Sequence, residues 1–413
     1  MISGIQIKEY LIIIPLVILT FFFHSEIFSP SNHPFIIFIL LFFVIFDKKV
    51  KFNYRQIFNW PVLIFLFFII YAYLRFDFSY FHGFDDDGFV IQTQVNHLTN
   101  MIIFFVIFIL SIILSCSDRK IPGYISKYAL IYIIMLMFAA IIRASEDYSL
   151  GLGTIFLTTL PFIFLGFNDI DKFKSIKINL ISIFVLIALM IFGNRAASLS
   201  VVIFLILYNV WPLFVRNKFY HLLIFIAFFI FLGLFFLIYL NSHDFISQHN
   251  YEIKRYSFIG GEFFSKALDT RYDIWFHLSS IIMNQINPAF GAGSHLSTSY
   301  LLPLSEYQFT LNRPNLDSHS VYLEIIYRMG LIGFILFISF IFSIWAAIWN
   351  LNKDQEIRIF APLIIAYLWL ITFQVSIFYG EDTLRDGFIF ILLGFAVGRY
   401  IYKKVSVKRR TTE

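Results

Sequence analysis

Long apolar runs recur along almost the whole chain and are separated by short polar segments. A run of roughly 20 apolar residues crosses a bilayer core as a helix, and these runs lack the alternation that a membrane barrel needs. The pattern therefore predicts an all-α polytopic membrane protein with about 12 transmembrane helices. The predicted helices lie near residues 9–24, 34–46, 57–75, 98–115, 128–142, 150–167, 178–193, 197–214, 220–240, 331–349, 359–379 and 387–402.

One polar interval, from about Asn241 to Ser318, is much longer than the others. Loops of that length in compact proteins are usually functional. We expect a single membrane domain with this loop inserted: residues 1–240 form the first nine transmembrane helices, 241–318 form the loop, and 319–413 form the last three helices and a basic cytoplasmic tail.

The loop itself shows a helical pattern from Phe264 to Ile286. Apolar residues repeat there at three- and four-residue spacing, which predicts an amphipathic helix that lies on the membrane surface or covers a cavity. These residues are Leu268, Tyr272, Trp275, Ile282 and Ile286. Asn287 and Pro288 end the pattern, and Gly291 and Gly293 predict a tight turn.

Composition excludes an ordinary soluble domain, since 59% of the residues are hydrophobic, 56 are Phe and only 14% are charged. The single cysteine, Cys116, excludes an intramolecular disulfide and a cysteine zinc cluster. The formal net charge of +5 comes from the predicted cytoplasmic segments, so it indicates membrane orientation and not nucleic-acid binding.

Basic residues set the predicted orientation. Most of the 31 lysines and arginines lie on alternate connections that include both ends of the chain, which places both termini in the cytoplasm and the long loop outside it. The first apolar segment is expected to be a retained span, because no small-residue cleavage site follows it. Basic residues on the outer side are mostly arginines, namely Arg75, Arg143, Arg195, Arg255, Arg271, Arg313, Arg328 and Arg385.

Arginine presents a planar fork that matches pairs of phosphate or carboxylate oxygens, so this enrichment indicates an anionic ligand outside the cytoplasm. The alternative is that these arginines pair with lipid headgroups or with nearby carboxylates. The carboxylates in question are Asp85, Asp86, Asp87, Glu381 and Asp382.

Two arginines are stronger candidates. Arg195 lies between two predicted spans and precedes small residues, and an arginine at such depth is costly unless it is paired or faces water. Arg271 and Trp275 are four residues apart, so both lie on one helix face, where they suit a sugar ring beside a phosphate. Simple packing is the alternative for Trp275.

A second helix is predicted to open with Asp317 and Ser318 as caps and to continue into the tenth span. Glu324 and Arg328 have the spacing of an intrahelical ion pair, which favours a structural role for Arg328. His319 lies at the predicted membrane interface, where an imidazole with a pKa of about 6.5 can take a proton from a hydroxyl.

These pieces together resemble the O-antigen polymerase and ligase superfamily of bacterial envelopes. The resemblance is carried by Asn194-Arg195-Ala196-Ala197, then Arg271, Trp275 and Pro288-x-x-Gly291-x-Gly293 in the outer loop, then His319 through Gly333. The similar motifs lie within residues 193–335, and the predicted arrangement of transmembrane helices is similar over the whole chain. The family commonly has Ser where this chain has Asn194, and often Asn where it has Ser320.

The resemblance implies a GT-C-like fold and metal-independent glycosyl transfer at the periplasmic face of the bacterial inner membrane. Arg195 and Arg271 would hold the diphosphate of an undecaprenyl-diphosphate-linked glycan and stabilise its leaving charge, and His319 would deprotonate the acceptor hydroxyl for an inverting displacement. Further substrate contacts are expected from Trp275, Gly291, Gly293, Arg313 and Arg328. No cofactor is implied, and the expected partners are the lipid-linked oligosaccharide, membrane lipids and a polysaccharide chain-length regulator.

Four functions stay open at this point. The high Phe and Ile content favours polymerase over ligase, because this composition resembles that of O-antigen polymerases. The ligase would instead transfer the finished polymer to the lipid A core. A transporter or flippase for a lipid-linked sugar would show paired repeats and broken helices, and a metal-using glycosyltransferase would rely on Asp85, Asp86 and Asp87.

Overall fold

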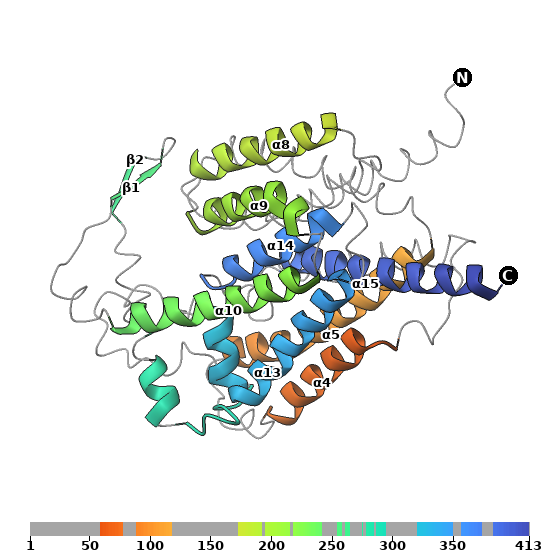
Figure 1. Cartoon of the computed structure of the whole chain (residues 1–413). Helices are drawn as coiled ribbons and strands as arrows, with labels where there is room; N and C mark the ends of the chain where they lie inside the picture. Colours follow the sequence, from red (N-terminus) through yellow and green to blue (C-terminus); the bar gives the residue numbers. More distant parts are fainter. Residues whose placement is uncertain are drawn as a thin grey trace.

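The computed structural model describes the chain as a bundle of helices with one small hairpin of strands (Figure 1). The described residues are 58–76, 88–117, 172–191, 195–214, 218–241, 254–257, 261–264, 275, 278–284, 286–294, 320–349, 357–373 and 383–412. The elements are α4 (Trp60–Leu74), α5 (Gly88–Ser117), α8 (Lys172–Ile191), α9 (Arg195–Phe214), α10 (Lys218–Asn241), β1 (Lys254–Ser257), β2 (Gly261–Phe264), α13 (Val321–Trp349), α14 (Ile357–Leu370) and α15 (Thr383–Thr412).

Helix α4 begins where the sequence supplies a cap. The Asn59 side chain accepts a hydrogen bond from the Val62 amide at 3.3 Å, and Pro61 occupies the first turn, where its missing N–H costs nothing. In the middle of the helix Phe65 is fully buried, and its ring stacks on Phe340 of α13 at 4.5 Å and on Phe390 of α15 at 5.4 Å. One aromatic side chain therefore joins three helices of the bundle.

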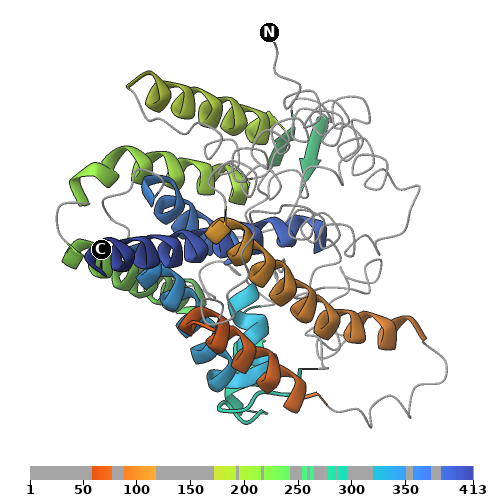
Figure 2. The same cartoon turned by 90° about the vertical axis from the view of Figure 1, so that its right-hand side faces the viewer.

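Helices α5 and α15, drawn in orange and dark blue in Figure 2, cross each other and pack closely there. Gly394 and Gly398 form a small-residue face on α15, and added Cβ atoms there would lie 2.6 Å from the Phe108 carbonyl oxygen and 2.7 Å from the Ile112 carbonyl oxygen. The Ser115 hydroxyl crosses the contact and donates to the Phe395 carbonyl at 3.0 Å. This close backbone approach is the packing that small residues allow between membrane helices.

Elsewhere in the bundle α9 lies between α8 and α14 and packs against both (Figure 1). The Asn179 and Asn209 side-chain amides exchange two hydrogen bonds, at 3.1 and 3.0 Å, between α8 and α9. Trp211 of α9 and Phe225 of α10 both contact Trp345 of α13, with ring centroids 6.0 and 5.5 Å apart. These contacts tie α9 and α10 to α13.

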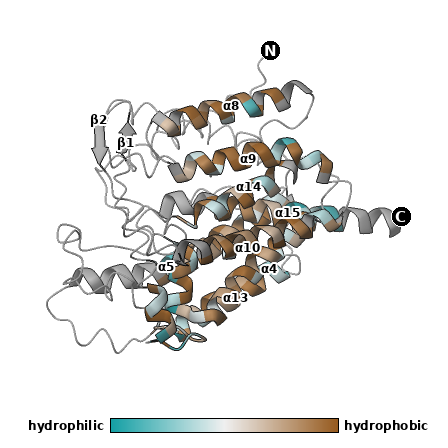
Figure 3. Cartoon of the chain, turned by 60° about the vertical axis from the view of Figure 1, so that its left-hand side comes forward, coloured by the Kyte–Doolittle hydropathy of each residue, from teal (hydrophilic) through white to brown (hydrophobic). Residues whose placement is uncertain are grey.

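Three described helical segments are long and apolar enough to cross a bilayer: Leu98–Cys116, Ala196–Leu213 and Val321–Trp349. Shorter apolar helical segments are Trp60–Leu74, Ile178–Ile187, Leu222–Phe235 and Ile359–Leu370. Figure 3 shows hydrophobic residues along the helices, and many are exposed, including Phe184, Ile206 and Leu234. A helical bundle with apolar side chains on its outer surface is the arrangement of a polytopic membrane protein.

The predicted helices near 57–75, 98–115, 178–193, 197–214, 220–240, 331–349, 359–379 and 387–402 all have described counterparts. Helices α5 and α15 extend well beyond their predicted spans because hydropathy detects the membrane-crossing part and not the polar turns that continue the helix. In contrast, α14 ends earlier than predicted, at Leu370, where turn hydrogen bonds at Thr372 and Phe373 replace the helix. The predicted spans 9–24, 34–46, 128–142 and 150–167 lie outside the described residues.

The long loop contains an element that was not predicted. Strands β1 and β2 pair antiparallel, with Lys254 opposite Phe264 and Ser257 opposite Gly261. The predicted helix start at Phe264 is therefore wrong, since Phe264 ends β2. Helical backbone is described farther along, at residues 275 and 278–284, so the amphipathic pattern correctly indicated a helix there.

Candidate functional site

Helix α13 is broken in the middle of the region that carries the candidate residues. Gly330 has φ 65° and ψ −167°, a conformation outside the helical region that only glycine adopts easily. A break of this kind removes backbone hydrogen bonds on both sides, and buried backbone groups must find other partners. The chain segment 287–294 supplies them.

This segment, which we call the junction loop, lies against the break and bonds to both halves of α13. The amides of Ala292 and Gly293 donate to the Tyr327 and Arg328 carbonyls at 2.7 and 3.0 Å. These bonds give hydrogen-bond donors to the carbonyls at the end of the first half of α13. The amides of Leu331 and Ile332, at the start of the second half, donate to the loop carbonyls of Pro288 and Ala289 at 2.9 and 3.2 Å. Each such bond, if lost in a buried setting, costs about 1–3 kcal/mol.

The glycines of the predicted turn make this contact possible. Gly291 and Gly293 both have positive φ, 74° and 131°. A Cβ atom on Gly291 would lie 2.5 Å from the Gly330 nitrogen, so no larger residue fits between the loop and the helix. Gly291 therefore has a clear local role, since it lets two backbones meet, and both predicted substrate-binding glycines supply positive φ angles to the loop.

The end of α4 holds the other side of the junction loop. Arg75 donates from Nε to the Phe290 carbonyl at 3.1 Å and from Nη2 to the Gly291 carbonyl at 3.0 Å. Its own carbonyl accepts from the Ser294 amide at 3.1 Å, and the Ser294 hydroxyl donates to the Ala72 carbonyl at 2.5 Å. Arg75 thus contacts backbone carbonyls. The alternative interpretation of the outer arginines had expected carboxylates or lipid headgroups.

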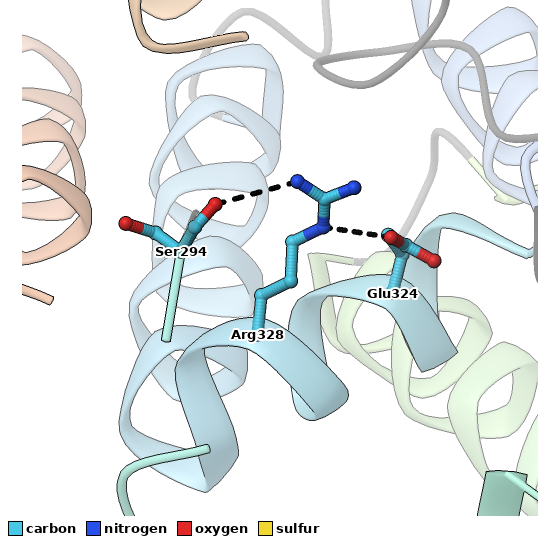
Figure 4. Close-up of polar contacts among 3 residues, drawn as sticks. All are labelled: Ser294, Glu324 and Arg328. Atoms are coloured by element: carbon cyan, nitrogen blue, oxygen red, sulfur yellow. Dashed lines mark hydrogen bonds and ion pairs between the residues drawn. The ribbon is translucent and has the colours of Figure 1, made fainter. Parts of the chain in front are cut away.

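The predicted ion pair in α13 is confirmed (Figure 4). Arg328 Nε lies 2.7 Å from Glu324 Oε1, and the two side chains are 1% and 0% exposed. Arg328 also donates from Nη1 to the Ser294 carbonyl at 3.3 Å. Because a buried charge without its partner is very unfavourable, this pair fixes the first half of α13 and the end of the junction loop together.

Trp275 lies in a small apolar cluster that includes residues of the first half of α13. It is 1% exposed and packs with Leu278, Ile281, Ile282, Leu323 and Tyr327. Its ring centroid is 6.1 Å from that of Phe373. This placement is the one expected of a packing residue, the alternative that the sequence left open for Trp275, and it shows that the amphipathic stripe of the loop faces α13.

The start of α13 differs from its prediction. The Ser320 carbonyl accepts the first helical bond, from the Glu324 amide at 3.0 Å, so Ser320 occupies the N-cap position and the predicted caps Asp317 and Ser318 are wrong. The Val321 amide donates to the Ile371 carbonyl at 3.0 Å, and Tyr322 Oη donates to the Leu368 carbonyl at 2.8 Å. The end of α14 thus contacts the start of α13, two residues after His319, which itself lies outside the described residues.

Arg195 is the first residue of α9. A cation is unfavourable at the positive end of a helix dipole, so helix stability does not explain this position. Ala197, two residues on, is fully buried, and the Ser200 hydroxyl bonds back to the Ala196 carbonyl at 2.8 Å. The small residues after Arg195 therefore pack inside the bundle, as their size predicts.

The remaining candidates, Arg271 and Arg313, lie outside the described residues, as do Asp85, Asp86 and Asp87. Among the described residues, no three His, Cys, Asp or Glu side chains gather closely enough to hold a metal ion. The structure thus brings Gly291, Gly293 and Arg328 together at one place. It adds Arg75, Ser294 and Gly330, whose roles depend on contacts that are distant in sequence.

Comparison with known families gives one match. Residues 180–338 match the model of a family described as O-antigen ligase. No curated protein matches the chain. This match supports the resemblance to the O-antigen polymerase and ligase superfamily that the motifs around Arg195, Gly291 and His319 indicate.

Proposed function

We propose that this membrane protein belongs to the O-antigen ligase and polymerase superfamily and is an O-antigen polymerase. It transfers an undecaprenyl-diphosphate-linked glycan to a sugar hydroxyl of another lipid-linked repeat unit. The family match supports glycosyl transfer of this superfamily, and the high Phe and Ile content favours polymerase over ligase. The matched residues 180–338 include every nominated residue: Arg195, Arg271, Trp275, Gly291, Gly293, Arg313, His319 and Arg328.

In the proposed reaction the acceptor hydroxyl attacks the anomeric carbon of the donor glycan, and the bond from that carbon to the diphosphate breaks. His319 takes the hydroxyl proton, and the electron pair leaves with undecaprenyl diphosphate. Arg195 and Arg271 stabilise the charge that develops on the diphosphate, which is the role a metal ion has in other glycosyl transfers. The position of Arg195 in the chain supports this, since Arg195 begins α9 and the backbone at a helix N-terminus attracts anions.

The junction supports the proposal in a second way. His319 lies two residues before the start of α13, and α13 is fixed at its first half by the ion pair of Glu324 and Arg328 and by the junction loop. Groups that act together in a transition state need a rigid frame, because small displacements lower the rate steeply. In our proposal Arg328 belongs to this frame, and Arg313 binds substrate.

We further propose about 12 transmembrane helices, an inner-membrane location, cytoplasmic termini and a periplasmic site. Single-cysteine labelling tests this topology well, because Cys116→Ser removes the only native thiol. A membrane-impermeant maleimide should label a cysteine placed at Ser305 in intact cells with a permeable outer membrane, and should label one placed at Thr411 only after lysis. The reverse pattern would overturn the orientation.

The function is tested by deleting the gene in its host and restoring it as wild type, His319→Ala or His249→Ala. The last variant is the matched control, because His249 lies in the long loop that His319 follows and has no proposed role. Lipopolysaccharide is then separated on a gel, and membrane levels of each variant are compared. We expect core bearing a single repeat in the deletion strain, and full ladders from wild type and His249→Ala but not from His319→Ala.

Ligase is the second candidate, because the matched family is described by that activity. A ligase deletion would leave bare core and would let polymer accumulate on the lipid carrier. That result would replace the polymerase proposal. A full ladder from His319→Ala would instead remove His319 from the mechanism.

A further inference from the structure

Helix α4 contributes to the candidate site although it lies outside the matched segment 180–338. Four hydrogen bonds join its end to the junction loop, two from the Arg75 side chain to carbonyls and two from Ser294 to the Arg75 and Ala72 carbonyls. The loop is thus held from α4 on one side and from α13 on the other. Neither the motif nor the family match indicates this second attachment.

The Arg75 guanidinium is turned toward the loop. Two of its N–H groups meet two successive carbonyls, and its central carbon lies 5.9 Å from the centroid of the Phe290 ring. A planar fork can bond two neighbouring acceptors at once, whereas a lysine ammonium acts as a single point charge. The geometry therefore suits a role in holding the loop backbone.

The position of the junction loop determines whether the backbone groups at the break in α13 have hydrogen-bond partners. If the loop moves away, the amides of Leu331 and Ile332 and the carbonyls of Tyr327 and Arg328 lose their partners together. Those groups flank Gly330, eleven residues after His319. Arg75 is therefore linked, through the junction loop, to the helix that His319 precedes.

We propose that Arg75 is a positioning residue: it fixes the junction loop against the break in α13 and so sets the placement of the glycosyl-transfer site without touching substrate. This inference rests on the proposed function for its catalytic consequence. Its structural part, that Arg75 holds the loop, is independent of the reaction. The competing role is direct binding of the donor diphosphate by Arg75.

The test uses the full-length purified protein in lipid nanodiscs and two measurements. Amide hydrogen exchange is followed by mass spectrometry over peptides that cover residues 287–294 and 327–332, and glycosyl transfer is followed with a lipid-linked repeat unit at varied donor concentration. The variants are Arg75→Gln, Arg75→Lys and Ser294→Ala. Lys404→Gln is the matched control, because it removes an exposed cation elsewhere, on α15.

We expect Arg75→Gln to speed exchange at the junction by about tenfold to a hundredfold, the range that follows from losing charge-assisted hydrogen bonds. Exchange in α5 and α15 should not change. The value of kcat should fall at least tenfold with a donor KM within about threefold of wild type. Arg75→Lys should restore only part of the protection, Ser294→Ala should show the same regional effect in smaller size, and Lys404→Gln should match wild type.

Unchanged junction exchange in both Arg75→Gln and Ser294→Ala would overturn the proposal. So would a large rise in donor KM with unchanged exchange, which is the result expected for direct diphosphate binding, or faster exchange with unaltered transfer. If wild type transfers no glycan, the proposed function fails, and the exchange measurement still decides whether Arg75 holds the loop.

Discussion

The substitution Gly330→Ala tests the junction most sharply, because it adds one methyl group at the break in α13. The added Cβ would collide with the Ala289 carbonyl group and lie 2.6 Å from the Gly291 nitrogen. The backbone there has φ 65° and ψ −167°, which strains any residue that carries a Cβ. Both effects act at the same place, so the loop and the helix cannot keep their present positions.

The cost can be worked from these contacts. Strain at this backbone conformation is about 1–3 kcal/mol. Displacing the loop weakens the bonds from Leu331 to Pro288 and from Ile332 to Ala289, now 2.9 and 3.2 Å, for about 1–3 kcal/mol each if both groups stay buried and unpaired. We expect the free energy of unfolding to fall by about 4 kcal/mol, allowing for partial relaxation.

Unfolding of the purified protein in mixed micelles of mild detergent and SDS measures this change. Gly233→Ala in α10 is the matched control, since no atom lies within 4 Å of its added Cβ. Replacing a helical glycine with alanine there should stabilise the protein by about 0.5–1 kcal/mol. The reasoning would be refuted if Gly330→Ala were as stable as wild type while Gly233→Ala behaved as expected.

Three further substitutions can be measured by the same unfolding assay. Arg328→Ala should cost about 3–5 kcal/mol, because it removes the guanidinium that pairs with the buried Glu324 carboxylate. Adding Glu324→Leu should recover part of the loss, and a double variant no better than the single one would contradict this. Gly394→Ala should cost about 1–3 kcal/mol, because its Cβ would lie 2.6 Å from the Phe108 carbonyl oxygen of α5, and a neutral result would mean that the two helices separate easily. Phe65→Ala should cost about 3–5 kcal/mol through the cavity left among α4, α13 and α15, whereas Phe67→Ala on the exposed face of α4 should cost far less.

Local features of this chain were predictable from sequence. The ion pair of Glu324 and Arg328 was predicted because four-residue spacing brings side chains together within one helix, whatever the rest of the fold does. The turn at Gly291 and Gly293 was predicted because glycine is the residue that tolerates positive φ. The three described helical segments that are long and apolar enough to cross a bilayer were predicted from the length of the apolar runs.

Features that depend on tertiary contacts were not predictable in the same way. Gly330 is one of several glycines near α13, and only the docked junction loop makes it the point where the helix breaks. Arg75 contacts carbonyls 215 and 216 positions away, and no local pattern connects them. The face of Gly394 and Gly398 had a readable signal, the small-residue spacing of packed membrane helices, but its partner α5 could not be chosen from sequence.

The most direct measurement of the central claim is transfer by the purified protein with a defined undecaprenyl-diphosphate-linked repeat unit, in the presence of EDTA. The account predicts that wild type forms a ladder of longer lipid-linked glycans and releases one undecaprenyl diphosphate for each bond formed, and that His319→Ala, present at equal amount, forms none. A wild-type protein that neither lengthens the glycan nor releases undecaprenyl diphosphate, or that does so only after a divalent metal is restored, would contradict it.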